Sequence, residues 1–283
     1  MSGSINTNVG AMVALQSLTA TNSQLSATQK QISTGYRVAD ATDDGAAYAV
    51  AQGVRSSVSA LTTANQQLGS TQGLLSTTSS ALNSMSTTMT GMRDVLVNLA
   101  SSNVTGTQRT QYQQQYASML LNVKSFIQDA TYNGQTLIGN VAGSSGKFSS
   151  VAVVRNEVGS TYGIATAGGS AIYNSISAAG AALTSTAAAA AITATGSFLT
   201  AQNKVSSALN TYGNATNYVN NQVSYNSNKI DALNAGLGSL VDANLAQESA
   251  QLQALQIKQQ LATQAITIAN QTPSTLLTLV KAA

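Results

Sequence analysis

The chain has 283 residues, of which only 7 % are charged, and its 12 basic and 9 acidic side chains give a net charge of +3. It contains no cysteine and no histidine, which excludes disulfides, zinc fingers, Cys or His metal sites and Cys–His or Ser–His–Asp catalysis. The remaining residues form no constellation that supports an enzyme or a clustered set of metal ligands, so we expect no metal, no cofactor and no enzymatic activity. The basic residues form no phosphate-binding cluster and the longest purely apolar run, 187–192, is too short to span a bilayer, so neither nucleic-acid binding nor membrane insertion is expected.

The N-terminal segment predicts a helix that packs along one side. Its first charge is Lys30, and it has no basic region of the kind that starts a cleavable signal peptide. Seven positions follow the alternating three- and four-residue spacing of a heptad repeat. They are Ala11, Leu15, Leu18, Asn22, Leu25, Gln29 and Ile32.

A longer helix is predicted over about 54–100, where the same spacing continues without interruption. At 1.5 Å per residue such a helix would be roughly 70 Å long. The positions of the repeat are Leu61, Ala64, Leu68, Thr71, Leu75, Thr78, Leu82, Met85, Met89, Met92, Leu96 and Leu99. We interpret the three methionines as core packing rather than as a ligand groove.

The middle of the chain changes character. A third helix is predicted over 112–130 after a break at 103–107, followed by a glycine-rich, β-type segment over about 132–178. Within it, 148–154 and 162–166 predict the two strands of a hairpin with a turn at 156–160.

Helical spacing returns after this insertion. One seam covers 209–240 and another covers 241–269, and the alanine run 187–191 also stands in a helical context. Thr272 and Pro273 predict the N-cap and first position of a short terminal helix.

The predicted fold class is therefore mainly α, a long antiparallel coiled-coil rod with a small β-hairpin insertion. Two packing modes fit the stripes: a monomeric helical bundle, or helices that bury their remaining faces against neighbouring copies. The scarcity of charge favours the second, because solvated helix faces usually carry Lys and Glu and neutral polar faces can be buried without desolvating ion pairs.

Four stretches resemble bacterial flagellins. They are 5–18 (INTNVGAMVALQSL), 31–47 (QISTGYRVADATDDGAA), 132–137 (YNGQTL) and 259–277 (QQLATQAITIANQTPSTLL). The matches cover both ends of the chain in the family's order, and the first block is most similar to short flagellins of the alphaproteobacterial type.

The resemblance implies a domain organisation. Residues 1–45 and 241–283 would form an inner coiled-coil tube in the polymer, and 46–240 would form a rod domain with the β-rich insertion at about 132–178. It also implies a secreted structural subunit that self-assembles, in many copies and with other flagellins, into the extracellular helical filament used for swimming. The alternative is a hook-filament junction protein, which shares flagellin-like ends.

The same resemblance implies the sites and the partners. The inner-tube interface would contain Leu15, Leu18, Leu25, Ile32, Leu252, Leu255, Leu261, Ile266 and Leu276. The joint between the inner and rod domains would contain Arg37, Asp40, Asp43 and Asp44. The expected partners are the flagellar export apparatus, an export chaperone, the filament cap and hook-junction proteins.

Two features of the joint have alternative interpretations. The Asp43–Asp44 pair before Gly45 could bind a cation or act in acid–base chemistry, but an N-cap for the helix that follows is the simpler interpretation. Arg37 is expected to pair with one of the nearby aspartates, within the chain or across subunits.

Two positions differ from the residues that many flagellins have there. Many flagellins present an Arg on the first rod helix and a Glu on the second to the vertebrate innate-immune flagellin receptor. Alignment through the neighbouring motifs places Gly91 and Gln115 there, which predicts weak or no binding to that receptor.

Overall fold

The computed structural model describes residues 7–180 and 184–282, with side-chain surroundings given as far as residue 271. Most of this chain is helical, so the mainly α prediction is confirmed. The helices are α1 (Val9–Thr34), α2 (Gly45–Ala100), α3 (Gly106–Asp129), α4 (Gly169–Gly180), α5 (Ser185–Ala191), α6 (Ser197–Val241) and α7 (Leu245–Ala282). The strands are β1 (Gln135–Thr136), β2 (Lys147–Phe148), β3 (Val151–Val154) and β4 (Thr161–Ile164).

The described residues form two compact units. One contains 7–56 and 232–282, and the other contains 57–180 and 184–231. The division falls about ten residues inside α2 and α6, whereas the sequence motifs suggest boundaries at 45/46 and 240/241. Among the described residues, no helix combines the length and the apolar character that crossing a bilayer requires.

The larger unit is built around α2, whose predicted seam is confirmed at every position. All twelve residues of the predicted repeat, from Leu61 to Leu99, are buried. Met85, Met89 and Met92 are fully buried in the hydrophobic core. Residues of α6, including Tyr212, complete this core, and α3 and α4 pack on it. The methionine stripe is therefore core packing.

The predicted hairpin is also confirmed. Strands β3 and β4 pair antiparallel with Val151 opposite Ile164 and Val154 opposite Thr161, while β1 and β2 form a small parallel pair. The Tyr162 ring of β4 stacks on Tyr218 of α6, with ring centroids 3.9 Å apart. This contact fixes the hairpin against the long helix.

Two local predictions are wrong. The β-type segment was expected to continue to about 178, but α4 begins at Gly169 and buries Ile172, Ile176 and Ala179 at helical spacing. The glycines around these three residues favoured a β-type interpretation over a helical one. No new helix opens at Thr272, because the α7 backbone remains helical across Pro273.

Candidate assembly surface

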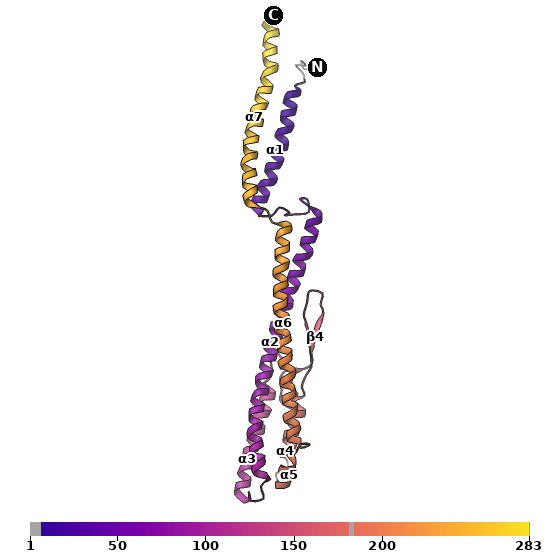
Figure 1. Cartoon of the computed structure of the whole chain (residues 1–283), viewed down its shortest axis with the longest axis vertical. Coiled ribbons are helices and arrows are strands. Elements are labelled where there is room, and N and C mark those ends of the chain that lie inside the picture. The colour runs from indigo at the N-terminus through magenta and orange to yellow at the C-terminus, as the bar shows by residue number, and fades with distance from the viewer. Residues whose placement is uncertain (1–6, 181–183, 283) are drawn as a thin grey trace. The chain divides into compact units, whose positions relative to one another are not determined.

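Helices α1 and α7 lie side by side and antiparallel (Figure 1) and make the most extensive helix–helix contact of their unit. Their less exposed positions recur at alternating spacings of three and four residues, as in a coiled coil. On α1 they are Ala11, Ala14, Leu18, Thr21, Leu25, Thr28 and Ile32. On α7 they are Leu252, Leu255, Gln259, Ala262, Ile266 and Ala269.

The predicted seam of α1 is half right. Ala11, Leu18, Leu25 and Ile32 face inward, but the positions between them are Ala14, Thr21 and Thr28 rather than Leu15, Asn22 and Gln29. Each of these three inward positions lies one residue before the predicted one, and each is filled by a small Ala or Thr side chain. Leu15 is instead 57 % exposed.

The residues predicted for the assembly interface divide into two groups. Those that face inward within the pair are Leu18, Leu25, Ile32, Leu252, Leu255 and Ile266. Leu15 and Leu261 point outward, Leu261 with 58 % of its surface exposed. Leu276 lies outside the residues whose side chains the structure describes.

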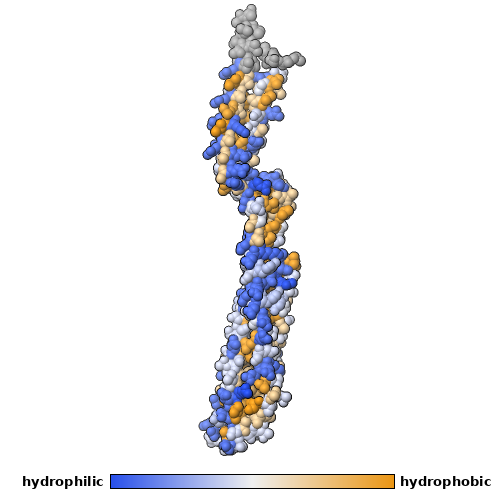
Figure 2. Space-filling view, in the orientation of Figure 1, coloured by the Kyte–Doolittle hydropathy of each residue, from blue (hydrophilic) through white to orange (hydrophobic). Residues whose placement is uncertain are grey.

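Exposed apolar side chains occur on both helices of the pair, and Figure 2 shows hydrophobic surface there among hydrophilic surface. These side chains are Val9, Met12, Val13, Leu15, Leu245, Ile257, Leu261 and Ile268, which we call the outer apolar row. No charged residue stands in 7–29, and Lys258 is the one charge in 249–271. Exposed apolar surface with so little charge is typical of a protein–protein interface.

Polar side chains fix the register of the pair. Asn8 caps α1 by accepting a 3.0 Å hydrogen bond from the Ala11 N–H, and its Nδ2 donates to the Ala269 carbonyl of α7 at 2.7 Å. Further along, Gln259 Nε2 donates to Asn22 Oδ1 at 2.8 Å. Each of the two bonds between α1 and α7 joins residues more than 230 positions apart in the chain.

The segment after α1 is held by a charged cluster. Lys30 Nζ lies 2.7 Å from Asp40 Oδ2 and 2.8 Å from Asp43 Oδ1. Hydrogen bonds from Lys30 hold the pKa of both carboxyl groups below the ordinary value, and the aspartates raise the pKa of Lys30. Asp43 Oδ2 also accepts from the Ala39 N–H at 3.0 Å, so one carboxylate orders both the loop and the ammonium.

The predicted pairing of Arg37 with an aspartate is wrong within this chain. Its Nη2 donates to the Leu240 carbonyl at 2.5 Å, and its backbone N–H donates to the Val241 carbonyl at 2.7 Å. Lys30 takes the aspartates instead, because it stands nearby on the last turns of α1. Spacing along the sequence did not reveal this choice.

Asp44 is the N-cap that the simpler interpretation predicted. Its Oδ1 accepts hydrogen bonds from the Ala46 and Ala47 N–H groups, both at 3.0 Å, at the start of α2. Within the described residues, no group of three or more carboxylates is placed to hold a metal ion. The hydrogen bonds of Asp43 and Asp44 give the acidic pair a structural role in the loop and at the start of α2.

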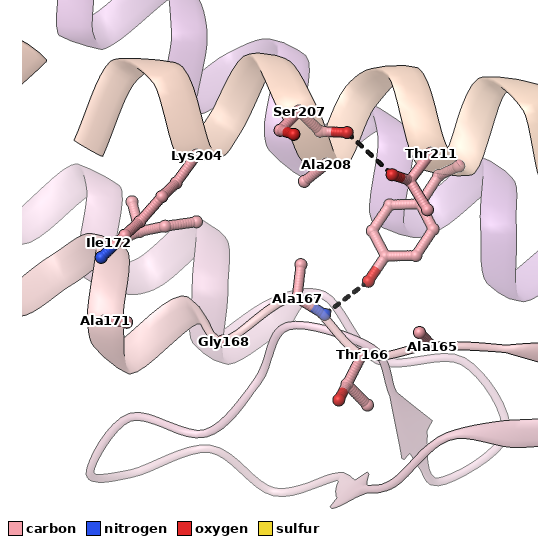
Figure 3. A pocket seen from close by; sticks show the side chains of 11 residues that line it. Ala165, Thr166, Ala167, Gly168, Ala171, Ile172, Lys204, Ser207, Ala208 and Thr211 are labelled. Carbon is pink, nitrogen blue, oxygen red and sulfur yellow. Dashed lines mark hydrogen bonds between the residues drawn. The ribbon is translucent and has the colours of Figure 1, made fainter. Parts of the chain in front are cut away.

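The larger unit contains a hollow of about 360 Å³ between the β4–α4 link and α6 (Figure 3). Its Tyr212 hydroxyl accepts from the Ala167 N–H at 2.7 Å, and burial raises the pKa of Tyr212 to about 12. The other lining groups are mostly small side chains, with Lys204 at the edge. The phenol is thus a neutral structural donor and acceptor, and it is poorly suited to acid–base chemistry.

Paired terminal helices, an uncharged apolar outer row and a core of long helices are typical of a structural protein that assembles from copies of itself. Residues 5–142 match the family model of the bacterial flagellin N-terminal helical region, and 179–280 match that of the C-terminal helical region. The chain belongs to the bacterial flagellin family.

Relatives that match along nearly the whole chain are also flagellins. The chain is 31 % identical to flagellin FljK of Caulobacter vibrioides over 280 residues and 30 % identical to a flagellin of Brucella melitensis over 283, with 98 % of each chain covered. A solved protein of Vibrio parahaemolyticus, described as flagellar hook-associated, has a TM-score of 0.59 and 18 % identity, covering 71 % of this chain and all of that one. That last likeness concerns the fold alone.

Proposed function

We propose that this chain is a structural, non-enzymatic subunit of a secreted flagellar filament used for swimming. The observation that carries the proposal is the outer apolar row of α1 and α7, in a chain similar to flagellins along 98 % of its length. A monomer gains nothing from such a surface, whereas a polymer buries it in every subunit.

The energetics favour this use of the row. Fully burying one Val, Leu, Ile or Met side chain contributes roughly 1.5–3 kcal/mol. Several such side chains from each of many subunits can offset the loss of translational and rotational freedom on association. We assign the inter-subunit contacts to Leu15 and Leu261, and the cohesion of the α1–α7 pair to Leu18, Leu25, Leu252 and Leu255. On this proposal the terminal segments 1–45 and 241–283 form the inner tube.

The charged cluster then acts as a joint. Lys30, Asp40 and Asp43 order the loop after α1, and Arg37 ties that loop to the last turn of α6. Val38, Ala51 and Val241 form a small buried cluster beneath these bonds. We propose that the joint sets the angle at which the inner-tube helices leave α2 and α6.

The proposed route to the filament is export through the flagellar apparatus. The absence of cysteine prevents cross-linking during transit, and a single proline limits slow isomerisation on refolding. The proposed partners are an export chaperone, the filament cap, hook-junction proteins and other flagellins. Binding to the innate-immune flagellin receptor is proposed to be weak, because the exposed Gln115 of α3 carries no charge and Gly91 has no side chain.

Negative-stain imaging of purified protein after salt-induced assembly tests the proposal. A filament subunit gives long helical polymers. Short collars or rings would instead support the hook-filament junction alternative, and a protein that stays monomeric at high concentration and salt would contradict both.

A further inference from the structure

A hollow of about 380 Å³ lies between α1 and α7 at the N-terminal end of α1. Met12, Leu15 and Ile266 supply its apolar lining, and Asn8 and Asn270 supply polar groups at its edge. Met12 belongs to the outer apolar row and has 61 % of its surface exposed. Met12 is therefore open to solvent in the free subunit, inside the surface proposed for assembly.

The other methionines with described surroundings are more protected. Met85, Met89 and Met92 have no exposed surface, and Met119 is only partly exposed against Gly91. Methionine reacts with oxidants in proportion to the access of its sulfur atom. The structure thus separates Met12 from the core methionines by position as well as by exposure.

We propose that Met12 is an oxidation site through which peroxide-class oxidants block assembly of the free subunit. The sulfur lone pair attacks one oxygen of hydrogen peroxide, an S–O bond forms and the O–O bond breaks. Met12 is oxidised to the sulfoxide and the peroxide is reduced to water. The inference rests on the proposed function, because it requires the hollow to be buried between subunits.

The sulfoxide changes the character of the hollow. It replaces a flexible apolar thioether with a strongly polar S=O group beside Leu15 and Ile266. Burying that oxygen without a hydrogen-bond donor is unfavourable, so the oxidised subunit should assemble poorly. In a filament the same burial should shield the sulfur, which makes oxidation selective for unassembled subunits.

The test begins with peptide mapping of the monomer after brief treatment with hydrogen peroxide. Fragment-ion spectra that separate Met12 from Met1 should show Met12 oxidised at least tenfold faster than Met85, Met89 and Met92. Equal rates would overturn the site. This measurement does not require a polymer, so it stands even if the protein fails to assemble, which would contradict the proposed function instead.

The second arm measures the critical concentration for salt-induced assembly by sedimentation. Peroxide should raise it on the order of tenfold for the wild type, and methionine sulfoxide reductases of both stereospecificities should restore it. Met12→Leu keeps the apolar volume but has no sulfur, so peroxide should leave its critical concentration at the value measured for the same variant before treatment, whereas peroxide should still raise that of Met119→Leu. A Met12→Leu protein that loses assembly with peroxide as the wild type does would overturn the proposal.

The third arm compares the two states of the wild type. Assembled filaments should show Met12 oxidised at least tenfold more slowly than monomers under the same treatment. Equal rates in filament and monomer would show that Met12 stays exposed after assembly and would refute its role in the interface.

Discussion

Gln259 of α7 donates a hydrogen bond from its Nε2 to the Oδ1 of Asn22 in α1, at 2.8 Å. Gln259 is a polar member of the inward stripe of α7, whereas Asn22 is exposed and adjoins the inward Thr21 of α1. The bond therefore joins the two antiparallel helices at the edge of their contact. A polar contact of this kind favours one register over shifted alternatives, as polar residues do in coiled coils.

Removing this contact should loosen the pair. In a double-mutant cycle of Asn22→Ala and Gln259→Ala, we expect a coupling free energy of about 0.5–1 kcal/mol. Hydrogen exchange of the α1 backbone amides is the measurement, since it reports local opening of this unit. Ser23→Ala is the control, because the Ser23 hydroxyl bonds within α1 to the Thr19 carbonyl. Additive effects of the two substitutions would show that the Asn22–Gln259 bond does not hold the pair.

Two glycines one turn apart in α2 should respond oppositely to alanine. A Cβ at Gly73 would lie 2.4 Å from the Tyr132 ring, whereas a Cβ at Gly69 would meet nothing within 4 Å. Gly69→Ala should stabilise the protein by up to about 1 kcal/mol through helix propensity. Gly73→Ala should lose that gain, because the ring of Tyr132 must move out of its packed position. Urea unfolding of both variants is the comparison, and equal stabilisation would contradict the packing of Tyr132 on α2.

The joint predicts a pH dependence with a defined sign. Lys30 holds the pKa of Asp40 and Asp43 below the ordinary 3.8 in the folded chain. A depressed carboxyl pKa contributes stability that is fully present above the unfolded value, and this stability is lost as the pH falls toward the folded values. The joint should therefore weaken below about pH 4 and stay intact at neutral pH.

Substitution of Lys30 tests this assignment. In Lys30→Gln, carboxyl ¹³C titration by NMR should show the pKa of Asp40 and Asp43 moving up toward 3.8. Lys258→Gln, which removes an exposed charge of α7, is the control and should leave both values in place. Unshifted carboxyl titrations in Lys30→Gln would mean that the cluster does not form in solution.

The sequence predicted the long helices better than the terminal pair. In α2 the apolar residues Leu61, Leu68, Leu75 and Leu82 recur at seven-residue spacing and leave one possible face, so the whole seam is confirmed. In α1 the shared positions are Ala11, Leu18, Leu25 and Ile32, but each gap offers two adjacent candidates. Hydrophobicity favoured Leu15 over Ala14 as the core residue. However, the helices approach closely, so the smaller side chain of Ala14 lies between them.

Long-range polar contacts were beyond sequence reasoning. The bond from Arg37 to the Leu240 carbonyl joins residues 203 positions apart. Its acceptor is a backbone carbonyl, which every residue has, so the residue type at position 240 does not predict the bond. The capping role of Asp44 was predictable because it depends on neighbours two and three residues away. The outward direction of Leu15 and Leu261 also required the structure, since hydrophobicity alone does not distinguish a core leucine from an interface leucine.

On the proposed function, the outer apolar row drives polymerisation while the inward seam holds the subunit together. The most direct measurement is the critical concentration of salt-induced assembly for Leu15→Gln/Leu261→Gln, compared with Val97→Gln, which alters an exposed apolar residue of α2. We predict that the double variant keeps the wild-type circular dichroism spectrum and forms no filaments, while Val97→Gln assembles normally. Filaments of Leu15→Gln/Leu261→Gln at the wild-type critical concentration would show that the outer apolar row does not drive polymerisation.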